Sequence, residues 1–147
     1  MSMEILLQMV QTQTNIYTDF GSDFKLDQHF NPLFAANGEA IMVEGSESAA
    51  QDIAISLKTP IGSLFYDNEF GSKLSLYAED EDSDKKRMNL CIDINDTINS
   101  DPRVEYNSTY TQVDNWELGK ITASCNFYLN DEAVSYRIEI GKTVEFL

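Results

Sequence analysis

Histidine, cysteine and the common nucleotide-binding motifs are scarce or missing in this chain. His29 is the only histidine, and the two cysteines, Cys91 and Cys125, lack CxxC spacing. A zinc site needs about four such ligands in a suitable pattern. No GxxxxGK[ST] or GxGxxG segment occurs. We therefore expect no catalytic residue, no metal and no cofactor. Carboxylates are abundant, so composition alone leaves a paired-carboxylate hydrolase open, although such a pair needs a cleft and one raised pKa.

Basic residues are also few. Lys and Arg number 10 against 25 Asp and Glu, which gives a formal net charge of −15. Such a surface repels phosphate backbones, so we expect no nucleic-acid binding, and it steers the chain toward basic partners. No run of about 18 apolar residues occurs, so we expect no membrane span. The apolar start is short and carries Glu4, which argues against a secretory signal. Isolated cysteines are typical of a reduced chain in the cytoplasm.

The 147 residues predict an N-terminal arm, residues 1–22, followed by a single α+β domain, residues 23–147. The arm is rich in Gln, Thr and Asn, and its apolar residues keep no long period. An extension laid on a partner and a fraying tail both remain open. The remaining length is sufficient for one domain with its own core.

A first helix is predicted after a short strand at residues 40–43 and Gly45. Ser48 and Gln51 have capping-box spacing, with Ser46 as an alternative cap. One apolar stripe follows: Ala50, Ile53, Ala54 and Leu57. Residues 59–62 contain proline and glycine and end the helix.

A second helix is predicted over residues 84–99, where Leu90, Ile94 and Ile98 form one row. Residues 64–76, between the two helices, are expected to be a loop. Residues 79–84 carry five acids, which suit the positive end of the second helix. A cation site is the less favoured alternative, because no glycine follows for the sharp turn of a metal loop.

After residue 103 the apolar period changes from helical to alternating, which predicts an antiparallel meander. The first strand is expected at 104–110 and the second at 121–129, with Trp116 in the connection between them. A third strand is expected at 134–140, and residues 143–147 form a short, unpaired fourth piece. The predicted fold class is α+β: two main helices packed on a small antiparallel sheet, with an extended N-terminal arm.

The corner between the second helix and the meander is Asp101-Pro102-Arg103. Pro102 cannot continue a helix, and it moves Asp101 out of the helical region. Arg103 adds a permanent cation with a planar fork of donors. The simplest interpretation is a helix stop with a solvated arginine; the alternative is a partner-binding corner.

Five motifs occur in a fixed order over residues 23–140, followed by the terminal strands. They are Glu44-Gly45, Gln51-Asp52-Ile53-Ala54-Ile55, Leu57-Lys58-Thr59-Pro60-Ile61-Gly62, Asp67-Asn68-Glu69-Phe70-Gly71-Ser72 and Asp101-Pro102-Arg103-Val104. Together they resemble the sheath-initiator family, also called the lysozyme-like baseplate wedge family, of contractile phage tails, tailocins and type VI secretion baseplates. The family's corner is usually Glu-Pro-Arg, so Asp101 is one methylene shorter here.

The resemblance implies a structural baseplate protein, not an enzyme, that docks on the wedge core and templates the first ring of the tail sheath. The implied partners are baseplate wedge proteins, the tail sheath protein and the tail tube or hub, with six copies per baseplate ring. The implied location is the tail baseplate of a virion or an equivalent injection particle, assembled in the bacterial cytoplasm. A muramidase-like peptidoglycan hydrolase associated with a phage tail is the alternative.

Two groups of residues are expected to bind these partners. The first is the corner, Asp101, Pro102 and Arg103. The second is the terminal edge, Thr143, Val144, Glu145 and Phe146, because an unpaired edge accepts a strand from a neighbouring subunit.

Overall fold

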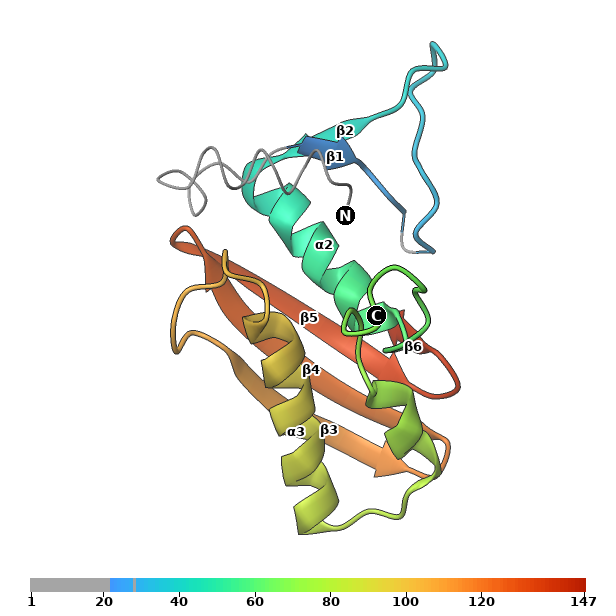
Figure 1. Ribbon diagram of the computed structural model, residues 1–147, viewed down its shortest axis with the longest axis vertical. Coiled ribbons are helices and arrows are strands. Elements are labelled where there is room, and N and C mark those ends of the chain that lie inside the picture. Colours follow the sequence, from blue (N-terminus) through green and yellow to red (C-terminus); the bar gives the residue numbers. More distant parts are fainter. Residues whose placement is uncertain (1–21, 28) are drawn as a thin grey trace.

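The computed structural model describes residues 22–27 and 29–147, and the predicted arm at 1–22 lies outside this range except for Ser22. Two α-helices cover one face of a four-stranded antiparallel sheet, and a separate two-stranded hairpin projects from the N-terminal end of α2 (Figure 1). The predicted combination of helices with antiparallel strands is therefore present. The main sheet has the four strands that were expected, although its first strand lies later in the chain, and the pairing of residues 22–24 with residues 42–44 in a hairpin was not predicted.

The main sheet is a meander in the order β3-β4-β5-β6. Its strands are β3 (Tyr110–Glu117), β4 (Lys120–Leu129), β5 (Glu132–Ile140) and β6 (Val144–Phe146). β4 and β5 are joined by Asn130 and Asp131, with φ of 48° and 65°. Positive φ at both central residues is typical of a tight hairpin turn whose twist matches that of its strands. The regular alternation of β4 is confirmed, since its five inward side chains are buried.

The two helices are α2 (Gly45–Lys58) and α3 (Asp84–Asn99). The bounds of α3 agree with the predicted range, and its row Leu90, Ile94 and Ile98 is fully buried. These side chains pack in one core cluster with the inward residues of α2 and of the sheet. The apolar row of the helix and the apolar face of the sheet thus bury each other. This is what the helical period of about 3.6 residues and the strand period of two predict.

The predicted start of the first helix is wrong. Glu44 is the residue before α2, and no side chain caps the helix there. Ser48 is instead buried inside the helix, while Gln51 accepts a bond from Leu26 N (3.0 Å) and donates to Phe24 O (2.6 Å). The reason is continuity: β2 runs directly into α2 through Gly45, whose φ of 61° suits glycine.

Three other local predictions are corrected. The first strand does not cover residues 104–109, since β3 begins only at Tyr110: Val104 forms one isolated bridge to Leu129, and Tyr106 is 92% exposed. Trp116 is not in a connection but on β3, buried and opposite Ile121. The expected loop over 64–76 ends earlier, because a 3-10 helix, η2 (Leu74–Glu79), begins inside it.

The hairpin consists of β1 (Ser22–Phe24) and β2 (Met42–Glu44). Beyond these strands three segments meet in a ring of backbone hydrogen bonds. Lys25 N donates to Ile41 O, Ile41 N to Leu33 O, and Leu33 N to Lys25 O, at 2.7 to 2.9 Å. This ring holds the hairpin together where the regular ladder ends.

Candidate functional site

The predicted corner is an ordered ion cluster between α3 and α2. Arg103 Nε donates to Asp101 Oδ1 at 2.9 Å and Nη2 to Asp101 Oδ2 at 2.6 Å, a bidentate pair. Asp101 Oδ1 also accepts from the backbone N of Arg103 at 3.0 Å. Such fork-to-carboxylate pairs are strong and geometrically specific. The arginine side chain is only 14% exposed, so it is not the solvated arginine of the simplest interpretation.

The same guanidinium connects the corner to the first helix. Arg103 Nη2 donates to Asp52 Oδ2 at 3.1 Å. Burial raises the pKa of the Asp52 carboxyl; the attraction of Arg103 offsets part of this, and the nearby Asp23 on β1 adds to the rise. For Arg103, burial opposes the charged form, but Asp101 and Asp52 outweigh it and raise the pKa of the guanidinium. One cation thus joins Asp52 on α2 to Asp101 in the corner that follows α3.

Asp52 was missed as a partner of Arg103 because it lies off the apolar stripe of α2. The signal available was its place in the Gln51-Asp52-Ile53 motif. The corner also faces outward: Pro102 is exposed. Within the described residues, Nη1 of Arg103 has no hydrogen-bond partner, since the bonds use Nε and Nη2. The corner is therefore fixed by its own hydrogen bonds through Nε and Nη2, while Nη1 is left as a donor for another molecule.

The Phe70-Gly71-Ser72 motif closes the C-terminal end of α2. Ser72 Oγ donates to Leu57 O at 2.7 Å, and Ser72 N donates to Thr59 O at 2.8 Å. Gly71 has φ of 114°, and a Cβ there would lie 2.4 Å from Thr59 O. Only glycine allows this close approach of two backbones. The motif thus positions the helix end that carries Lys58.

The terminal strand β6 forms one edge of the main sheet. Its register to β5 pairs Glu145 with Glu139, and Leu147 N donates to Arg137 O at 2.8 Å. In an antiparallel ladder these bonds alternate, so the backbone groups of Val144 and Phe146 point away from β5. The expectation of an unpaired fourth strand is therefore wrong for the side of β6 that faces β5. On its other side, β6 is an open edge of the sheet. The Val144 side chain, moreover, is buried in the core.

Lys58 lies beside this open edge. Its Nζ donates to Val144 O at 3.2 Å and forms an ion pair with Glu145 Oε2 at 3.1 Å. The bonds from Lys58 and Thr143 lower the pKa of the half-buried Glu145 carboxyl. Lys58 was missed as an edge residue, because on the sequence it is simply the last basic residue of a helix.

The opposite edge, β3, is irregular. Its register to β4 shifts between Val113 and Asn115, so Asp114 is bulged out of the ladder. Asp114 accepts bonds from Ser124 and Gln112. A bulge together with a charged side chain hinders the addition of another strand. The four residues expected at the terminal edge thus lie together at the edge that is not bulged.

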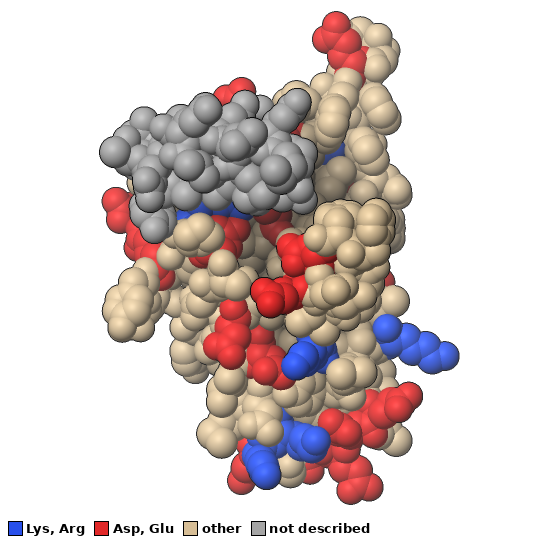
Figure 2. Space-filling view, in the orientation of Figure 1, with Lys and Arg blue, Asp and Glu red and all other residues tan. Residues whose placement is uncertain are grey.

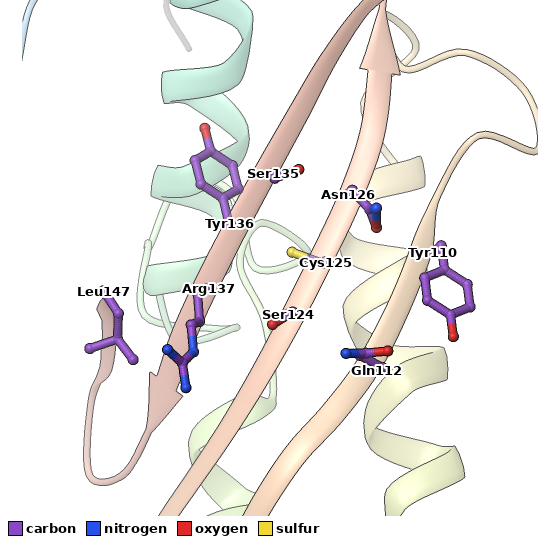
Figure 3. A pocket seen from close by; sticks show the side chains of 9 residues that line it. All are labelled: Tyr110, Gln112, Ser124, Cys125, Asn126, Ser135, Tyr136, Arg137 and Leu147. Atoms are coloured by element: carbon purple, nitrogen blue, oxygen red, sulfur yellow. The ribbon is translucent and has the colours of Figure 1, made fainter.

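The sheet face turned away from the helices is polar and carries a shallow hollow. Figure 3 shows a hollow over β3, β4 and β5 in which Gln112, Ser124, Asn126 and Arg137 project on the same side. The side chains of Cys125 and Tyr136 belong to the opposite, core-facing side.

Four further findings concern chemistry and location. Among residues 22–27 and 29–147, no group of three or more His, Cys, Asp and Glu side chains is placed to hold a metal ion. In the acidic stretch, Ser83 caps α3 by accepting from Lys86 N, and Asp82 pairs with Arg87. Both cysteines are free, and burial raises the pKa of the Cys125 thiol to about 12. In the part of the chain that is described, no helix is long and apolar enough to span a membrane.

These features define a class: a small helix-and-sheet protein with an ion-paired corner and an open sheet edge. The family model described as "Contractile injection system sheath initiator" matches residues 22–133. This covers most of the chain, so the chain belongs to the sheath-initiator family, which has a structural role in contractile injection systems. The matched range includes α2 and the corner and ends within β5. No curated protein matches the chain.

Proposed function

We propose that this protein sits in the baseplate of a contractile injection particle, docks on the wedge core and templates the first ring of the sheath. The observation that supports templating is the β6 edge, where Val144 and Phe146 direct their backbone groups away from β5. A sheath strand added there gains main-chain hydrogen bonds along this edge. Six copies around a ring would add avidity to this single contact.

The corner of Asp101, Pro102 and Arg103 is the proposed docking surface for the wedge core. Its support is the outward Pro102 and the Nη1 donors of an otherwise fixed guanidinium. A preorganised donor fork loses little freedom on binding, which favours affinity. The tail tube or hub is a further proposed neighbour, and assembly in the bacterial cytoplasm fits the two free cysteines.

Acidic side chains outnumber basic ones on the face shown in Figure 2, in keeping with the net charge of −15. Partner surfaces with an excess of Lys and Arg are therefore the electrostatically favoured ones.

The edge is tested by comparing Phe146→Pro with Phe146→Ala. Both variants lose the ring, but only proline removes the backbone N–H that points away from β5, so the pair isolates that donor. We expect both proteins to fold with similar thermal midpoints. Particles with Phe146→Ala should carry sheaths in electron micrographs, and particles with Phe146→Pro should be bare or rarely sheathed. Equal sheath numbers from the two variants would overturn templating at β6.

The hydrolase alternative is tested on the purified wild-type protein. We expect no release of reducing ends from purified peptidoglycan above the buffer background. Turnover that scales with protein concentration would replace the structural proposal by an enzymatic one.

A further inference from the structure

The open edge of β6 is not bare, because an aromatic side chain from the N-terminal hairpin lies beside it. The Phe30 ring lies 5.8 Å from the Phe146 ring, centroid to centroid. Lys58 Nζ lies 5.3 Å from the Phe30 centroid, within range of a cation–π contact. The same ammonium bonds to Val144 O, one of the outward backbone groups. Phe30 and Lys58 together therefore cover part of the edge.

The backbone that presents Phe30 is strained. Phe30 has φ of 65°, a conformation that bulky L residues rarely adopt. It is held by Asp27, whose carboxylate accepts from His29 N at 2.8 Å and Asn31 N at 3.0 Å, while Phe30 N donates to Asp27 O at 2.9 Å. Strained residues persist where the surroundings determine them, and they cluster at switch regions.

The position of Phe30 resembles that of a side chain on an added strand. On one sheet face, directly opposite residues of neighbouring strands have Cβ atoms roughly 5 Å apart, and their rings meet at comparable distances. Phe146 shares the core-facing side with Ile138 and already meets Tyr136 edge-on, with ring centroids 5.2 Å apart. Phe30 completes this aromatic row at the point where the sheet stops. A strand entering beside β6 has to displace that ring.

We propose that Phe30 guards the β6 edge, and that the strand it gives way to is an extended segment carrying a large apolar side chain opposite Phe146. This inference rests on the proposed addition of a sheath strand. The apolar residue of the incoming strand replaces the Phe30 ring against Phe146, and its backbone N–H replaces the Lys58 ammonium at Val144 O. Before the partner arrives, the guard prevents a second copy of this chain from pairing edge to edge.

The test uses Phe30→Asn, because asparagine tolerates a positive φ and removes the ring without disturbing the turn. Phe34→Asn is the matched control: Phe34 is an exposed aromatic residue of the same hairpin. The probes are two labelled eight-residue peptides of alternating threonine and valine, one with a central phenylalanine and the other with serine at that place. Binding is followed by fluorescence anisotropy, and the bound edge is identified by the amide NMR shifts of Val144 and Phe146.

We expect Phe30→Asn to bind the phenylalanine peptide about tenfold more tightly than the wild type, a change of roughly 1.4 kcal/mol. The serine peptide should gain far less, and Phe34→Asn should not differ from the wild type. Equal binding of the phenylalanine peptide by Phe30→Asn and the wild type would overturn the guard. Equal gains for both peptides would overturn the apolar partner residue. Dimerisation of Phe30→Asn in sedimentation, without a gain in peptide binding, would assign the edge to a second copy instead.

The comparison of Phe146→Pro with Phe146→Ala separates this inference from the proposed function. If that pair shows that sheath growth needs the outward N–H while Phe30→Asn changes nothing, templating stands and the guard is wrong. If the Phe146 pair shows no difference, templating at β6 fails whatever Phe30 does.

Discussion

Arg103, after the end of α3, donates to Asp52 on α2 at 3.1 Å while it holds Asp101 in a bidentate pair. One guanidinium thus sets the position of one helix relative to the end of the other. The corner that the sequence marks as a helix stop is a tertiary clamp, and its geometry depends on the arginine fork rather than on charge alone.

Arg103→Lys tests this clamp. Lysine keeps the charge but loses the fork, so we expect the domain to remain folded with its free energy of unfolding lowered by about 1 to 3 kcal/mol. Urea unfolding measures this, with Arg137→Lys, at a 63% exposed side chain, as the control. Incorporation of the Lys variant into baseplates should also fall. If the variant matched the wild type in both measurements, the fork would have no role.

Ile94→Ala tests the helical row that was predicted from periodicity. The side chain is fully buried, so the substitution should lower the free energy of unfolding by about 2 to 5 kcal/mol through lost burial and a new cavity. Ile92→Ala is a matched control on the same helix, since Ile92 is 47% exposed. Similar thermal midpoints for the two variants would contradict the packing described for α3.

Gly71→Ala tests the close approach beneath α2. An added Cβ would meet Thr59 O at 2.4 Å, so we expect a loss of at least about 2 kcal/mol in the free energy of unfolding. Gly38→Ala is the control, because Gly38 also has positive φ but nothing lies within 4 Å of the added atom. Its loss should be about 1 kcal/mol. Equal losses measured by urea unfolding would show that the clash relaxes freely.

The raised pKa of Asp52 predicts a pH dependence of stability. Its value in the unfolded chain is near 3.8, and burial raises the pKa of the carboxyl in the folded protein. The folded state therefore holds this proton more tightly. The stabilisation that this proton gives to the folded protein is fully present below pH 3.8. It is lost as the pH rises through the pKa that Asp52 has in the folded protein.

Asp52→Asn removes the titrating carboxyl, so a comparison of the variant with the wild type isolates the effect of Asp52. The difference in unfolding free energy, wild type minus variant, should fall as the pH rises above 3.8, and urea unfolding at several pH values measures it. A difference that rose with pH would mean that the ion pair with Arg103 outweighs the burial of Asp52.

Local pattern alone determined the elements that have one buried face and regular geometry. α3 and β4 were predicted within their observed limits because a helical row and an alternating strand each repeat without interruption. β3 was misplaced because the bulge at Asp114 reverses which positions point inward, so Trp116 falls out of step with Thr111 and Val113. Such a switch in which alternate positions face the core depends on how β3 pairs with its partner strand. The local sequence pattern carries no information about that pairing.

Residue types at the candidate site were also readable from sequence, since the Asp-Pro-Arg corner and the terminal strand stand out in the printed chain. What only the tertiary structure decided is which groups meet there. Asp52 reaches Arg103 across 51 positions, and Lys58 reaches Val144 across 86. Phe30 is brought to Phe146 from the opposite end of the described chain. Periodicity is a property of neighbouring residues, whereas these contacts arise only when helices, sheet and hairpin bury their apolar faces together.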